Sequence, residues 1–122
     1  MATTTIRPNG QTVSGSWTAV NAANIFTATS DNTDSSYANH PGFPGNGITL
    51  ALSFGPFTVP DHAIIISLTP RIRQRRPSGG FNNSFGLLLS GVMGPETTIT
   101  PSATPTTYTG TASTTRPGGG AW

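Results

Sequence analysis

Four of the six basic residues in this chain lie within six consecutive positions, at Arg71, Arg73, Arg75 and Arg76. Alternate residues of an extended strand lie on one face, about 6.6 Å apart. Arg71, Arg73 and Arg75 would therefore form a row of guanidinium groups, which can pair with a series of phosphates or with carboxylates of a neighbouring subunit. The alternative is a solvated hairpin end, because charged strand ends also protect a sheet against strand addition.

These basic residues do not make the kind of surface that binds nucleic acid. The chain has no lysine, and no aromatic residue alternates with the arginines to stack on bases. The pI near 10.0 reflects a net charge of only +2. We therefore expect protein partners and not DNA or RNA.

The acidic residues, histidines and serines show no catalytic or metal-binding pattern. Asp61 and His62 are adjacent, so on an extended chain they point to opposite faces, and Asp61 cannot orient His62 toward a nucleophile such as Ser67. The sequence has no Gly-x-Ser-x-Gly motif and no cysteine. Asp31 and Asp34 could help to bind Ca²⁺, but two carboxylates in a polar loop are common in turns. The sequence predicts neither an enzyme nor a cofactor or metal site.

Four aromatic residues suggest a different class of function. Trp17, Tyr37, Phe43 and Trp122 could form a sugar-stacking face of the kind found in carbohydrate-binding modules. The alternative is packing in the core or at an interface, which we favour because aromatic side chains bury a large area. An exposed face of Trp17, Tyr37 and Phe43 beside polar loops would support glycan binding.

Charged residues make up only 8% of the chain, compared with about 25% in an ordinary soluble domain. Repulsion between copies is therefore weak, and a nearly neutral polar surface tends to associate. No apolar run approaches the roughly 20 residues that span a bilayer, and the N-terminus lacks the basic and apolar regions of a signal peptide. We expect a protein that is made in the cytoplasm and kept there until it is assembled or released.

The sequence pattern predicts a series of short strands and no helix. Gly, Pro, Thr, Ser and Asn interrupt every window in which a 3.6-residue period could develop. The expected strands are residues 3–7, 11–20, 25–29, 48–54, 63–69, 81–93, 97–100 and 106–113, with a Pro- and Gly-rich loop over 39–47. Such short strands with frequent turn signals predict an all-β fold, a single antiparallel β-sandwich of jelly-roll type. The sandwich would span residues 11–113, between an N-terminal arm (1–10) and a glycine-rich tail (114–122).

Two apolar stretches are expected to form the core hairpin. Residues 63–69 are apolar on both faces, as in a central strand, and residues 85–89 return as the antiparallel partner. Pro70 interrupts the first strand and implies a bulge or a passage to the sheet edge. The tip from Arg71 to Arg76 is then left available for a partner.

Several short motifs resemble a family of uncharacterised structural proteins of tailed-bacteriophage virions. The matching segments are Thr5-Ile6-Arg7-Pro8-Asn9-Gly10, Ser14-Gly15-Ser16-Trp17-Thr18, Ser36-Tyr37-Ala38, Arg71-Ile72-Arg73, Leu87-Leu88-Leu89-Ser90-Gly91 and Tyr108-Thr109. In that family the segment similar to residues 115–122 continues into a further strand or helix, whereas this sequence stops at Trp122. Either this version is truncated, or a neighbouring copy supplies the last strand.

The resemblance implies a non-enzymatic structural protein of the virion, and we expect a capsid decoration or cement protein. Its arm (residues 3–7) and its tail (residues 116–122) would engage neighbouring subunits, namely the major capsid protein and copies of itself. The alternatives are a glycan-binding module of a tail or head fibre and the subunit of a self-assembling surface filament. No membrane contact is expected. The expected partner-binding residues are Arg7, Arg71, Arg73, Arg75, Arg76, Arg116 and Trp122.

Overall fold

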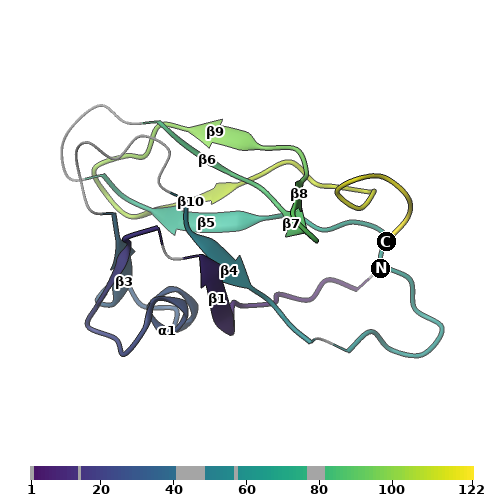
Figure 1. The fold of residues 1–122 in the computed structure, drawn as a ribbon, viewed down its shortest axis with the longest axis horizontal. Helices are drawn as coiled ribbons and strands as arrows, with labels where there is room; N and C mark the ends of the chain where they lie inside the picture. The colour runs from purple at the N-terminus through teal and green to yellow at the C-terminus, as the bar shows by residue number, and fades with distance from the viewer. Residues whose placement is uncertain (1, 14, 41–48, 57, 77–81) are drawn as a thin grey trace. The chain divides into compact units, whose positions relative to one another are not determined.

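The structure is a computed structural model that describes residues 2–13, 15–40, 49–56, 58–76 and 82–122. These residues form short strands and one short helix (Figure 1), so the predicted all-β class is confirmed. The chain divides into two compact units, Met1–Thr58 and Val59–Trp122. In the described ranges every sheet consists of two antiparallel strands. These sheets by themselves show no sandwich or jelly roll.

Two strand pairs and the helix build the first unit. The pairs are β1 (Gly10–Val13) with β4 (Ala51–Ser53), and β2 (Thr18–Val20) with β3 (Tyr37–Asn39). The strand predicted over 11–20 is broken in two, because the chain turns at Gly15 and Ser16, where φ is 50° and 68°. Positive φ takes the backbone out of the strand region. The strand predicted over 48–54 is confirmed in its central part as β4.

The helix α1 (Ile25–Ser30) occupies the place of the strand predicted over 25–29, so that prediction is wrong. Asn24 caps the helix: its Oδ1 accepts hydrogen bonds from the backbone N of Thr27 at 3.0 Å and from the Thr27 hydroxyl at 2.6 Å. Ile25 and Ala28 are three residues apart and share one helix face, which is buried. The cap and this spacing outweigh the strand preference of β-branched residues.

Few apolar side chains are buried. Ile25 and Ala28, with 4% and 3% exposure, are the only buried side chains among the described Ala, Val, Ile, Leu, Met and aromatic residues. α1 lies against β2 and β3. The buried hydroxyl of Ser36 donates to the carboxylate of Asp31 and so ties the end of α1 to the start of β3.

Three strand pairs build the second unit. They are β5 (Arg71–Gln74) with β10 (Thr106–Thr109), β6 (Asn83–Phe85) with β9 (Thr97–Ile99), and β7 (Leu88–Leu89) with β8 (Val92–Met93). The strands predicted over 97–100 and 106–113 are confirmed as β9 and β10. Directly after β10, a Cβ on Gly110 would lie 2.8 Å from Cγ of Pro70 and 3.0 Å from the Phe85 ring. Glycine is therefore required for this close approach.

The predicted core hairpin of residues 63–69 and 85–89 is wrong. Between 63 and 69 only Leu68 is bridged, and its partner is Ser113. The other stretch turns back on itself, because Ser90 and Gly91 have φ of 50° and 80°. Two consecutive residues with positive φ make the tight hairpin turn that joins β7 to β8. The stretch therefore pairs locally and with β9, and it never reaches residues 63–69.

The strand predicted near the N-terminus is not present, and most of one predicted loop lies outside the described residues. Residues 3–7 form no strand. Most of the predicted loop over 39–47, with Phe43 in it, is outside the described ranges.

The Asn24 cap can be tested by mutation. Asn24→Ala removes the acceptor for the Thr27 backbone N and should lower the free energy of unfolding by about 1 kcal/mol. Asn24→Asp keeps an acceptor at the same position and should retain most of the stability. Urea denaturation followed by circular dichroism measures both variants, and equal midpoints for Asn24→Ala and the parent would show that the cap contributes nothing.

Candidate functional site

The predicted row of arginines is present on β5. Arg71 and Arg73 are exposed, whereas Ile72 and Gln74 between and after them are half-buried. The alternation predicted for this stretch is therefore confirmed. β10 supports the row from one side: Arg73 lies opposite Thr107, and its Nη1 donates to the Thr107 hydroxyl at 3.5 Å.

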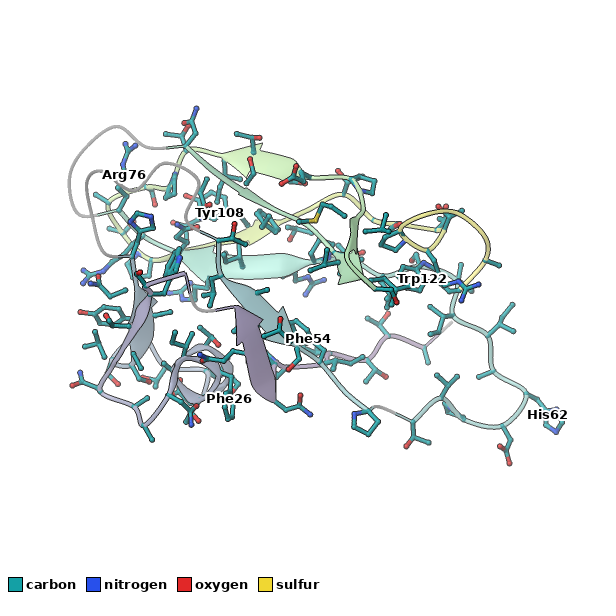
Figure 2. The ribbon with its side chains drawn as sticks, in the orientation of Figure 1. Phe26, Phe54, His62, Arg76, Tyr108 and Trp122 are labelled. Carbon is teal, nitrogen blue, oxygen red and sulfur yellow. The ribbon has the colours of Figure 1, made fainter. Side chains whose placement is uncertain are left out.

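Arg75 and Arg76 lie beyond the end of β5 and are held differently. Arg75 is exposed and Arg76 is half-buried. The backbone N of Arg76 donates to the carbonyl of Ser102 at 2.8 Å, and the backbone N of Ser102 donates to the hydroxyl of Tyr108 at 2.8 Å. Ser102 thus links the end of the arginine row to β10. Figure 2 labels Arg76 and Tyr108, the two residues that Ser102 joins.

The phenol of Tyr108 has a lowered pKa for a local reason. Hydrogen bonds from Ser102 to the phenol oxygen are the largest cause, and a hydrogen bond from Thr106 and the positive charge of Arg76 act in the same direction. Partial burial opposes them. These bonds favour the phenolate because each places positive hydrogen density at the oxygen.

Arg7 and Arg116, the two predicted binding arginines outside the β5 row, belong to different units. Nη2 of Arg7 donates to Oδ1 of Asn32 at 3.2 Å. Arg116 lies in a turn, since its backbone N donates to the Gly120 carbonyl at 3.0 Å and its carbonyl accepts from the Gly119 N at 2.8 Å. Each of the two arginines is therefore held by the local structure of its own unit.

Trp122 has a structural contact that the sequence did not reveal. Its indole Nε1 donates to the carbonyl of Ser113 at 2.9 Å; Figure 2 labels Trp122. The same carbonyl accepts the backbone N of Leu68 at 3.0 Å. Trp122 therefore supports the Leu68–Ser113 bridge, which joins residues 63–69 to the segment after β10. Its other predicted role, in binding a partner, stays a prediction.

The second unit leaves several large apolar side chains exposed. Ile64 is 82% exposed and Ile66 is 56% exposed. The four residues of the β7–β8 hairpin are also exposed, between 38% and 51%. Ile64, Ile66, Leu88 and Leu89 had been predicted to lie in the core hairpin, and Val92 and Met93 in the strand over 81–93. An apolar side chain that stays in water forfeits the stabilisation that burial would provide.

The candidate catalytic and metal-binding residues do not come together. Asp61 and His62 are exposed in a turn that the Ala63 N closes onto the Pro60 carbonyl at 3.0 Å. In the first unit Asp31 accepts from the Thr33 N at 3.1 Å and from Ser36. No group of three or more potential metal ligands occurs within the described residues.

Of the aromatic residues proposed for sugar stacking, the structure describes Trp17 and Tyr37 in the first unit. The Trp17 ring is half-buried and meets His40 edge to face, with ring centroids 5.0 Å apart. Its Nε1 is buried without an acceptor in the part of the chain that the structure describes. Tyr37 is 38% exposed, and Phe43 is outside the described residues.

The comparisons with known proteins identify no relative of this chain. No family model matches the chain, and no curated protein or solved structure matches it. In the described residues no helix is long and apolar enough to cross a bilayer.

Tyr108 should ionise below the ordinary tyrosine pKa of about 10. Because the folded protein releases this proton more easily than the unfolded chain, the free energy of unfolding should rise with pH between the lowered pKa and about 10. Ultraviolet titration at the phenolate band should show an early component that Tyr108→Phe removes. Ser102→Pro, which lacks the donating N, should shift that component upward, and an unshifted component would show that Ser102 is not the cause.

Proposed function

We propose that this chain is a non-enzymatic structural subunit of a phage virion, a capsid decoration or cement protein that is completed by its neighbours. The observation that carries the proposal is the small amount of core. Among the described residues no side chain is completely buried, and of the Ala, Val, Ile, Leu, Met and aromatic side chains only Ile25 and Ala28 are buried. A monomeric domain of this length would bury about two thirds of the surface of its unfolded chain.

The total surface of the chain supports the same conclusion. Its accessible area is 8252 Å², whereas a compact monomer of this mass exposes about 6,200 Å². Even two separate compact bodies of half the mass would expose only about 7,500 Å² together. The excess is about 750 Å² relative to two bodies and about 2,050 Å² relative to one, which is close to or larger than the roughly 800 Å² that one partner contributes to a standard interface. A subunit that gains its stability by binding neighbours has this property.

The virion role rests on the resemblance of the sequence motifs and on composition. A surface with few charges permits many copies to lie close together without strong repulsion. The two-layer sandwich of jelly-roll type is part of the proposal: the short antiparallel sheets and the exposed apolar side chains of the second unit would be completed when subunits assemble. The protein would be found in the virion, with no membrane contact and no cofactor.

The mechanism is adhesion. Arg71 and Arg73 are exposed on one face of β5, where they can pair with carboxylates of the major capsid protein. Arg75 and Arg76 extend the row beyond the strand. Arg7 in the first unit, and Arg116 with Trp122 in the second, would contact neighbouring subunits near the chain ends.

Attachment through β5 should depend on charge. Replacing both Arg71 and Arg73 with Ala should reduce the copies bound per virion several-fold at about 0.15 M salt, because exposed ion pairs between subunits are lost. Quantitative mass spectrometry of virions purified from the phage that encodes the chain gives the occupancy.

Thr109→Ala is the matched control, because Thr109 lies opposite Arg71 on β10 and is exposed but uncharged. Its occupancy should equal that of the parent. Unchanged occupancy of the double variant would remove the arginine part of the mechanism. Virions that contain no copy of the parent chain would refute the virion role.

A further inference from the structure

Residues 63–69 lead directly into β5. Their even-numbered side chains continue the half-buried face of β5, which we call the inner face, beyond the residues that cover it. Side chains of alternate residues lie on one face of an extended chain. On this face Ile72 and Leu68 are half-buried, whereas Ile66 and Ile64 are 56% and 82% exposed. The apolar stripe thus continues past the point where the second unit covers it.

The hydrogen bonds of Leu68 and Pro70 show which way the backbone faces. Leu68 exchanges two bonds with Ser113, at 3.0 and 2.8 Å, and the Pro70 carbonyl accepts from the Gly110 N at 2.8 Å. Backbone groups of alternate residues point to the same edge of a strand. The even-numbered residues therefore face β10, and the odd-numbered residues of 63–69 face the opposite edge, which we call the outer edge. Pro70 has no backbone N–H, but that group would lie on the β10 side. The outer edge therefore keeps all of its N–H donors.

Within the described residues of the second unit, the outer edge has no partner. β5 is paired with β10 alone in its sheet. The backbone groups of residues 64–67 make no hydrogen bond to another described residue. An unpaired edge that carries isoleucines is a template for a strand of another chain.

A second copy of the same chain fits this edge. Two identical edges can pair about a two-fold axis, because each supplies the surface that the other needs. The excess surface of the chain is close to or larger than one partner's share of a standard interface. Residues 63–69 carry no charge, so no like charges meet in the pair.

We propose that two copies of this chain pair residues 63–69 antiparallel along their outer edges, about a two-fold axis at Ile66. Ile65 and Ser67 then exchange backbone hydrogen bonds with Ser67 and Ile65 of the other copy, as their outward-facing groups require. Ile64 lies opposite Leu68 of the other copy. The pairing covers the exposed end of the apolar stripe, and it does not depend on the virion role: a dimer could form whatever shell it binds.

Single-cysteine variants test the register, since the natural sequence has no cysteine. On the axis, Cα atoms of a non-hydrogen-bonded pair are about 4.5 Å apart, which is within disulfide range. Cα atoms of residue 64 in the two copies would be about 13 Å apart. Under mild oxidation Ile66→Cys should form disulfide dimers at least tenfold faster than Ile64→Cys. Position 64 is the more exposed, so random collision would favour it, and equal or reversed rates would overturn the proposal.

Proline variants test the outer edge. Ser67→Pro removes a backbone N–H from this edge, whereas Ile64→Pro removes one that faces the β10 side. In sedimentation velocity at tens of micromolar, the parent and Ile64→Pro should sediment with twice the chain mass, and Ser67→Pro with the mass of one chain. Neither N–H bonds to a described residue, and circular dichroism confirms that both variants fold.

A parent of single-chain mass, a dimeric Ser67→Pro variant or an open filament of the parent would each overturn the two-fold pairing. The outcome is separate from the virion test. A dimer of a chain that is absent from virions would leave the pairing intact and refute only the virion role.

Discussion

The bridge between Leu68 and Ser113 is the interaction on which the arrangement of the second unit depends. Two backbone hydrogen bonds join these residues, and the indole of Trp122 donates to the same Ser113 carbonyl. The bridge continues the β5–β10 ladder, and it decides which edge of the chain before β5 faces inward. Pairing ends there because the chain after Ser113 turns away, with Arg116 bonded to Gly119 and Gly120. Residues 63–67 consequently lack a strand partner in the described chain.

Hydrogen bonds of hydroxyl groups provide much of the stabilisation that ion pairs and apolar cores provide in other domains. Ser102 joins the end of β5 to Tyr108 on β10. The hydroxyls of Ser84 and Thr98 bond across β6 and β9 at 2.8 Å. Such cross-strand pairs contribute about 0.2–1 kcal/mol each. Bonds of this size can define local structure, but they do not replace a core, and the exposed isoleucines and the β7–β8 hairpin remain as surface for partners.

The arginine row and the outer edge are two different surfaces of the same strand region. The guanidinium groups of Arg71 and Arg73 extend from the exposed face of β5, whereas the outer edge presents backbone groups of residues 63–69. Ion pairs weaken with salt, and backbone pairing with apolar contact depends much less on it. A subunit with both can bind copies of itself and a shell through contacts of unlike chemistry, which is consistent with the role proposed for the chain.

The sequence by itself determined the features that depend on local pattern. Period-two alternation placed Arg71 and Arg73 on one face, and β-branched runs between turn residues located β9 and β10. A local signal was also missed, since Asn24 before Ile25 and Ala28 marks a helix start. The partner of residues 63–69 could be identified only in the tertiary structure. The apolar sequence pattern of a strand is the same whether or not a partner strand lies beside it. The tight turn at Ser90 and Gly91 and the contact of Trp122 with Ser113 settled that pairing, and both depend on backbone geometry that residue types alone do not specify.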